Sequence, residues 1–159
     1  MYQSFKKLRT NILIWLTHNM ALPILQKFRN EKAFPYSVDE LSKFPPGSLG
    51  KDLYFFLDEK QLELLPHYAR HDIKHILLEY DTTESGEVCL QCFMLGNGHV
   101  SFPVLATVSY GIVTMPEYYP LFLKAFKRGK QCKAISNWNW YELLQSNTTN
   151  LQLILAKLG

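Results

Sequence analysis

Apolar side chains recur every three or four residues along most of this chain, in stretches separated by proline and glycine. That period matches the α-helical turn, and proline and glycine are frequent where helices end. The expected helices run, in order, from about residue 5 to a kink at Pro23, from Ser37 to Pro45, from Ser48 to about Lys60, from Pro66 to about Asp81, from Thr82 or Thr83 to about Leu95, after Pro103, after Pro116, and from about Asn150 to Leu158. The sequence therefore predicts an all-α helical bundle.

Two segments carry additional local information. Ser37 and Glu40 have the spacing of a capping box, in which the serine oxygen accepts a backbone N–H and the glutamate reaches back to the serine N–H. A short helix is expected to begin there. Residues 104–113 are rich in β-branched side chains and fit either a strand or a buried helix, because periodicity does not distinguish the two.

Length and composition indicate one domain that spans residues 1–159. With 159 residues and 47% hydrophobic side chains, the chain can bury a core without a disulfide or a metal to hold it together. We find no internal repeat, low-complexity tract or linker. A bound metal would therefore indicate function more than structural support.

The three cysteines argue against a disulfide framework because their number is odd. Cys89 and Cys92 form a C-x-x-C pair, but no second pair completes a zinc ribbon. We interpret them as small residues of a buried helix face, and we expect a reducing cytoplasm.

The net charge of +3 is small but unevenly distributed. No acidic residue precedes Glu31, and a second stretch without acids, residues 118–141, carries five basic side chains. Both stretches adjoin apolar or aromatic residues, which suits an anionic membrane surface or lipid headgroup as well as an ordinary solvated face. Nucleic acid is not among the expected partners.

The first helix is expected to provide an amphipathic surface rather than a targeting segment. Its apolar run is too short to span a bilayer, and no signal-peptidase site follows it. We expect this surface to mediate homodimerisation or peripheral attachment at the inner face of the membrane, as in a bacterial-type cytoplasmic protein. Its apolar residues are Phe5, Leu8, Ile12, Trp15 and Leu16, beside Lys6, Lys7 and Arg9.

One constellation carries the chemistry of a metal site. His71 and His75 lie one helical turn apart, and Asp72 lies about 100° around from His71, so the three can converge on one point. The interval before Glu87 allows the chain to turn and to bring that carboxylate back on an adjacent antiparallel helix. These ligands suit Zn²⁺ above all, with Fe²⁺ or Mn²⁺ possible if water completes the site.

Other interpretations of these residues remain open. The helix could lie at the surface, with Asp72 paired to Lys74 or Arg70. A metal-dependent hydrolase would use Asp72 as a general base, although aspartate is one methylene shorter than the glutamate of H-E-x-x-H. A non-catalytic lipid-binding scaffold would use the metal only to lock two helices. Glu63 and His67 extend the row of His71 and could orient an imidazole, but an exposed stripe is preferred.

The motif His71-Asp72-x-x-His75, followed by Glu87, resembles the signature of the coenzyme Q biosynthesis protein 4 family. Further similar segments are Pro46-Gly47-Ser48-Leu49-Gly50 with Tyr54 and Leu57, Gly86-Glu87-Val88 with Leu90 and Phe93, and, more weakly, Trp140, Leu143, Leu144, Leu151 and Leu155. The chain departs from the family pattern at Gln91 and Met94, where Lys and Glu are frequent, and its C-terminal third is the least similar part.

This resemblance implies an all-helical bundle with His71, Asp72, His75 and Glu87 as metal ligands. It also implies a role in ubiquinone biosynthesis at the membrane, through oxidative decarboxylation at ring carbon 1 of a polyprenyl benzoate, through organisation of the other quinone-biosynthesis proteins, or through both. An isoprenoid or acyl lipid is then the expected ligand of the apolar helical surface. The resemblance implies the metal ligands but no further catalytic residue.

Overall fold

The structure, a computed structural model, describes residues 34–156. The amphipathic surface predicted for the first helix, and the last residues of the helix expected to end at Leu158, lie outside this part of the chain. The α-helices in residues 34–156 are α3 (Val38–Ser42), α4 (Leu49–Lys60), α5 (Ala69–Leu78), α6 (Glu84–Gly96), α7 (Phe102–Thr114), α8 (Tyr119–Gln131) and α9 (Thr148–Ala156). Two 3₁₀ helices complete the set, η2 (Pro116–Tyr118) and η3 (Glu142–Gln145).

The all-α prediction is confirmed, because residues 34–156 contain no strand. An isolated antiparallel bridge joins Ser48 to Asn147. Residues 104–113, which fit a strand or a helix by sequence, belong to α7. None of the helices in the described part of the chain has both the length and the apolar character needed to cross a bilayer.

Local capping fixes where several helices begin. The capping box at Ser37 is present as predicted: its backbone N–H donates to Glu40 Oε2 over 2.7 Å, and its hydroxyl accepts the Glu40 N–H. Thr83 caps α6 by accepting the N–H of Gly86 over 3.1 Å. The helix expected from Pro66 begins later than predicted, at Ala69, because residues 66–68 form a turn.

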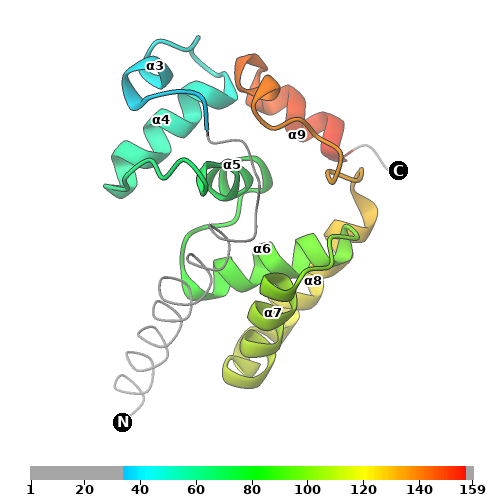
Figure 1. Cartoon of the computed structure of the whole chain (residues 1–159). Coiled ribbons are helices and arrows are strands. Elements are labelled where there is room, and N and C mark those ends of the chain that lie inside the picture. The colour runs from blue at the N-terminus through cyan, green and yellow to red at the C-terminus, as the bar shows by residue number, and fades with distance from the viewer. Residues whose placement is uncertain (1–33, 157–159) are drawn as a thin grey trace.

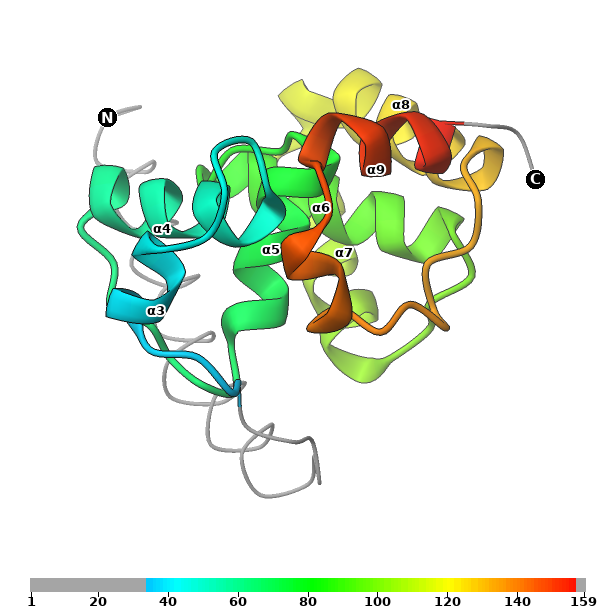
Figure 2. The ribbon, with the colours of Figure 1, turned by 90° about the horizontal axis from the view of Figure 1, so that it is seen from above.

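The helices divide into two groups that meet where α5 packs on α6. Helices α3, α4, α5 and α9 lie on one side of that contact, and α6, α7 and α8 on the other (Figure 1). Seen from above, α4 and α9 lie in front of the layer that contains α6, α7 and α8 (Figure 2). Two buried clusters fill the interior. One, built around Leu53, Ile73 and Leu144, also takes in Phe93 of α6, and the other is built around Val88 and Phe122.

Helix α6 holds the second group together because both α7 and α8 pack against it. The α6–α8 contact is close at two glycines: a Cβ at Gly96 would collide with the Phe126 carbonyl, and one at Gly129 with the Phe93 carbonyl. Cys89 and Cys92 are buried on α6, which confirms their interpretation as small residues of a buried helix face.

Candidate metal centre

Two helices bring the predicted ligands together. Helix α5 carries His71 and His75 one turn apart, and the first turn of α6 carries Glu87. The turn between the helices is braced at Gly86, where any Cβ would collide with the side chain and carbonyl of Asp81. The carboxylate of Glu87 therefore returns to the face of α5 that carries both imidazoles.

The three side chains present their ligand atoms to one another. His71 Nε2 lies 3.0 Å from His75 Nε2 and 3.2 Å from Glu87 Oε2, and His75 Nε2 lies 3.0 Å from Glu87 Oε1. Bond lengths of about 2.0–2.2 Å to a tetrahedral zinc ion would place neighbouring ligand atoms about 3.3–3.6 Å apart. The site therefore needs only a small expansion to hold such an ion, and its two imidazoles and carboxylate are ligands that Zn²⁺, Fe²⁺ and Mn²⁺ accept.

The orientation of His75 favours metal binding. Its Nδ1 lies 2.9 Å from the backbone oxygen of Tyr80. Because a carbonyl oxygen can only accept, Nδ1 carries a proton, and the lone pair of Nε2 faces His71 and Glu87 whenever the ring is neutral. The Phe56 ring stacks on the imidazole at 6.2 Å with an interplanar angle of 17°. A hydrogen bond of this kind commonly orients a metal-bound histidine.

The charges of the ion-free site are set by burial and by the contacts among the three residues. Burial opposes ionisation of Glu87, but the hydrogen bonds from His71 and His75 outweigh it and lower the pKa of Glu87 to about 2. Burial also opposes protonation of His75, yet the hydrogen bond and charge of Glu87 leave its pKa raised. For His71, burial prevails and lowers the pKa. A bound cation would therefore compete with a proton for Nε2 of His75.

Asp72 lies beside this group but does not join it. It is buried on α5, and its oxygens are not among the donor atoms that converge. Burial raises the pKa of Asp72 to about 7; the charge of His75 opposes this shift and the charge of Glu87 adds to it. A carboxyl with a pKa near 7 is only partly ionised at neutral pH and becomes a better ligand as a cation approaches, so the assignment of Asp72 as a fourth ligand stays a prediction.

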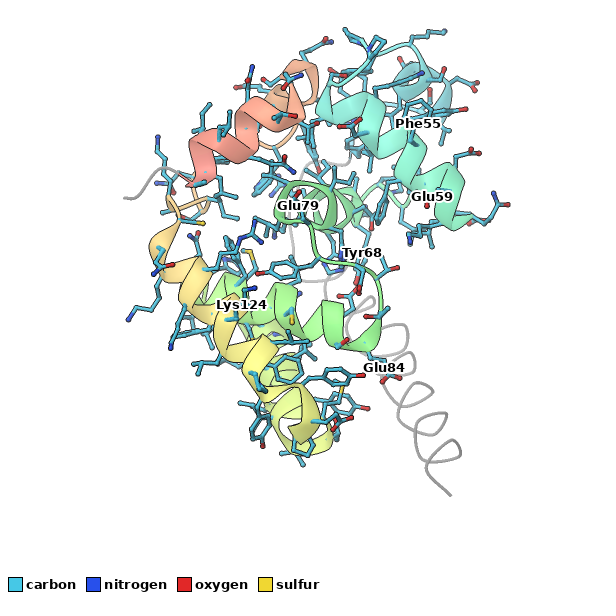
Figure 3. All side chains as sticks on the ribbon, turned by 180° about the vertical axis from the view of Figure 1, so that it is seen from behind. Phe55, Glu59, Tyr68, Glu79, Glu84 and Lys124 are labelled. Atoms are coloured by element: carbon cyan, nitrogen blue, oxygen red, sulfur yellow. The ribbon has the colours of Figure 1, made fainter. Side chains whose placement is uncertain are left out.

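Tyr68 forms part of the same site and was not found from the sequence. It lies between α5 and the start of α6 (Figure 3), with its ring centroid 4.7 Å from that of His71. Burial, together with the charges of Glu87 and Asp72, raises the pKa of Tyr68. Its phenol therefore keeps its proton beside the two carboxyl groups. Because the helix was expected to begin at Pro66, the i, i+3 spacing from Tyr68 to His71 could have suggested this contact.

The other residues weighed as parts of the site lie apart from it. Glu63 and His67 are exposed, as the preferred interpretation expected, but they precede α5 and so do not continue the helical row of His71. On another side of α5, Arg70 lies over the ring of Tyr141 and Lys74 over that of Trp140. Helix α5 is therefore not a surface helix whose histidines face water.

Comparison with known proteins gives the family context of this site. No family model matches the chain. The protein named "Ubiquinone biosynthesis protein COQ4, mitochondrial" from Komagataella phaffii is 24% identical over 149 residues, which cover 77% of this chain and 47% of that protein. The chain is related to the coenzyme Q biosynthesis protein 4 family. It spans about half the length of the curated relative it matches.

A solved structure from Nostoc punctiforme PCC 73102, provisionally named a ubiquinone biosynthesis protein, has the same fold. It superposes with a TM-score of 0.64, covers 96% of this chain and 81% of its own, and is 20% identical in sequence. At that identity the likeness concerns the fold.

Proposed function

We propose that this protein holds one divalent metal ion, Zn²⁺ by preference, and acts on a carboxylated aromatic ring with a polyprenyl tail in ubiquinone or related prenyl-lipid biosynthesis. The reaction is oxidative decarboxylation at ring carbon 1: the carboxyl group leaves as carbon dioxide, a hydroxyl group from water takes its place, and an external two-electron oxidant such as dioxygen, reduced to hydrogen peroxide, accepts the electrons. The observation that carries the proposal is the convergence of His71, His75 and Glu87, whose ligand atoms lie 3.0–3.4 Å apart.

The residues present have distinct tasks in this proposal. His71, His75 and Glu87 would hold the ion, which would supply Lewis acidity toward a carboxylate or phenolate oxygen. Three protein ligands leave a coordination position for substrate, as in catalytic rather than structural zinc sites. The protonated Tyr68 phenol lies where it can donate a hydrogen bond to an anionic substrate oxygen. Asp72 would either complete the ligand set or accept a proton as the cation lowers its pKa.

The exposed face of α7 supports the proposed lipid and membrane contact. We define this apolar face by four side chains that are 45–79% exposed: Phe102, Leu105, Ile112 and Val113. The neighbouring α8 exposes Lys124, Lys127 and Lys130. An apolar helix face beside basic residues suits an anionic membrane surface. We propose peripheral attachment through this region, and the same face is available for a homodimer.

A metal-locked scaffold that organises other quinone-biosynthesis proteins is the second candidate. It would require a closed set of four ligands, which Asp72 could complete. The fold is the same in both candidates. What distinguishes catalysis from scaffolding is whether the fourth coordination position is open or is filled by Asp72.

The test combines native mass spectrometry, metal analysis and lipid extraction of the purified protein. We expect about one divalent ion per chain and a retained isoprenoid or acyl lipid. Metal-dependent turnover of polyprenylated hydroxybenzoates is expected in the wild type and in His67→Ala, which removes an exposed histidine, but not in His75→Ala. Metal binding without lipid or turnover would favour the scaffold, and full occupancy in both His75→Ala and Glu87→Ala would place the ion elsewhere.

A further inference from the structure

The turn after α5 contains a disfavoured backbone conformation. Glu79 follows the last residue of the helix with φ of 58°, in the left-handed region that residues other than glycine rarely adopt. Such a conformation persists only where neighbouring contacts fix it. The next residue is Tyr80, whose carbonyl accepts the hydrogen bond from His75 Nδ1. The conformation of Glu79 therefore determines where that carbonyl points.

Arg128 of α8 contacts the residues on both sides of Glu79. Its Nη1 donates to the Leu78 carbonyl over 2.6 Å, which satisfies an otherwise unpaired group at the end of α5. Its guanidinium carbon lies 5.4 Å from the Tyr80 ring centroid and 5.5 Å from that of Phe93. The two aromatic rings also lie 6.1 Å from each other. The planar guanidinium of Arg128 thus contacts the Leu78 carbonyl, before Glu79, and the Tyr80 ring, after it.

These contacts form a continuous path from α8 to the site. We propose that Arg128 is a positioning residue for the metal centre: by holding Leu78 and Tyr80, it keeps the Tyr80 carbonyl on His75 Nδ1 and so aims His75 Nε2 at Glu87. The importance of this role rests on the proposed metal function. The contacts that carry the inference, however, are those of the protein without an ion. The inference assigns a role to a residue 53 positions away from His75 in the sequence.

For these contacts the planar shape of the Arg128 side chain matters more than its charge. The nearest ion-pair contact, between Arg128 Nη2 and Glu79 Oε2, is 3.9 Å long, and the Glu79 side chain is 68% exposed. Exposed pairs of that length contribute little. The planar fork, in contrast, donates to a carbonyl while it stacks on aromatic rings, which a lysine ammonium does not reproduce. Glu79→Gln is therefore expected to be neutral, and Arg128→Lys only partly functional.

The first experiment measures the His75 ring in the metal-free protein by long-range ¹H–¹⁵N NMR, with signals assigned by their loss in His75→Gln. The wild type is expected to show a protonated Nδ1 that exchanges slowly with water. In Arg128→Ala we expect this proton to exchange about tenfold faster and the two tautomers to mix. Lys127→Ala, an exposed neighbour on α8, is the matched control and should leave the ring signals unchanged.

The second experiment is a pair of double-mutant cycles read by zinc competition. Loss of groups that orient a ligand typically weakens metal binding about 10–100-fold, and we expect about tenfold for Arg128→Ala. If Arg128 acts through His75, that loss disappears in the His75→Ala background and persists in the His71→Ala background. An equal loss in both backgrounds would overturn the proposal, because it would reflect a general weakening of the fold.

The two experiments separate this inference from the proposed function. If the wild type binds no zinc, the metal proposal fails, while the metal-free NMR comparison still decides the role of Arg128. Unchanged His75 exchange and tautomer in Arg128→Ala would overturn the positioning role even if zinc binds well. If Arg128→Ala does not fold, the same comparison is made with Arg128→Lys, for which an intermediate exchange rate is expected and a wild-type rate contradicts the proposal.

Discussion

Helices α5 and α7 place their side chains in opposite ways. Helix α5 buries Asp72 and His75, which are polar, whereas α7 exposes Phe102 and Val113, which are apolar. Each arrangement costs free energy in an isolated folded chain, because buried charges lose hydration and exposed apolar groups order water. In the proposed function a ligand reduces both costs: a cation for α5, and an apolar surface for α7. On that proposal, the chemistry takes place on one side of α6 and the attachment on the other.

The largest effect is expected from the ligands on α5 and α6. His75→Ala and Glu87→Ala should each weaken zinc binding by more than about 100-fold, because each removes a bond to the ion rather than a group that orients one. Competition titration with a chromophoric chelator measures this. His67→Ala and Glu63→Ala remove the same side-chain types from exposed positions and should change nothing. Comparable losses in these controls would show that the site is not confined to the α5–α6 contact.

The second prediction concerns the cost of burying Asp72. Its folded pKa of about 7 exceeds the ordinary value of 3.8, so the folded protein binds more protons than the unfolded chain between these limits. Stability of the metal-free protein should therefore fall as pH rises from about 4 to 7. Asp72→Asn should remove this fall and stabilise the metal-free protein at pH 8 by on the order of 2 kcal/mol.

Chemical denaturation at pH 4 and pH 8 tests this prediction, because the difference between wild type and Asp72→Asn should be nearly absent at the lower pH. Glu87 contributes in the opposite direction: its pKa of about 2 lies below the ordinary 4.5, so its stabilisation is present above about pH 4.5 and is lost as pH falls toward 2. If Asp72→Asn stabilises the protein yet weakens zinc binding, the Asp72 carboxyl contributes to metal binding at a cost in folding stability.

A third prediction tests the apolar face of α7. The double variant Phe102→Ser and Val113→Ser removes two large exposed apolar groups and should reduce binding to anionic liposomes about tenfold, with little loss of folding stability. Vesicle co-sedimentation measures the first quantity and thermal unfolding the second. Leu153→Ser, at another exposed apolar position, on α9, is the control. Equal effects of the two changes would assign attachment to general surface hydrophobicity.

The smallest expected effect concerns the N-terminal caps of α6 and α7. Thr83 caps α6 through a side-chain hydrogen bond, whereas Ser101, at the same position of α7, makes none. Thr83→Ala should cost about 1 kcal/mol and weaken zinc binding a few-fold, because the first turn of α6 carries Glu87. Ser101→Ala should be close to neutral. Equal costs would mean that the position of Glu87 does not depend on its cap.

The sequence predicted best those features that depend on residues within one helical turn of each other. The pairing of His71 with His75 and the cap at Ser37 follow from spacings of four and three residues, and both are present. The start of α5 was misplaced because Pro66 favours a first helical turn but equally fits the turn that forms there.

The parts of the site that the sequence did not reveal depend on contacts between distant segments. A backbone carbonyl orients His75, and no side-chain pattern identifies which carbonyl that is. The bond from Arg128 to Leu78 spans 50 positions and depends on how α8 crosses α6. Burial of Asp72 follows from the packing around α5, whereas the spacing of the motif made it appear as available to a metal as its neighbours.

The close contact of α6 with α8 limits which pairs of positions can vary together. Gly96 and Gly129 each face backbone atoms of the opposite helix, and a backbone carbonyl cannot be made smaller by substitution. No second change can therefore accommodate a larger residue at either site. Gly111 differs, because a Cβ there would meet the side chain of Val88. Gly111→Ala is thus expected to be rescued by Val88→Ala, so this pair can covary where the two α6–α8 glycines cannot.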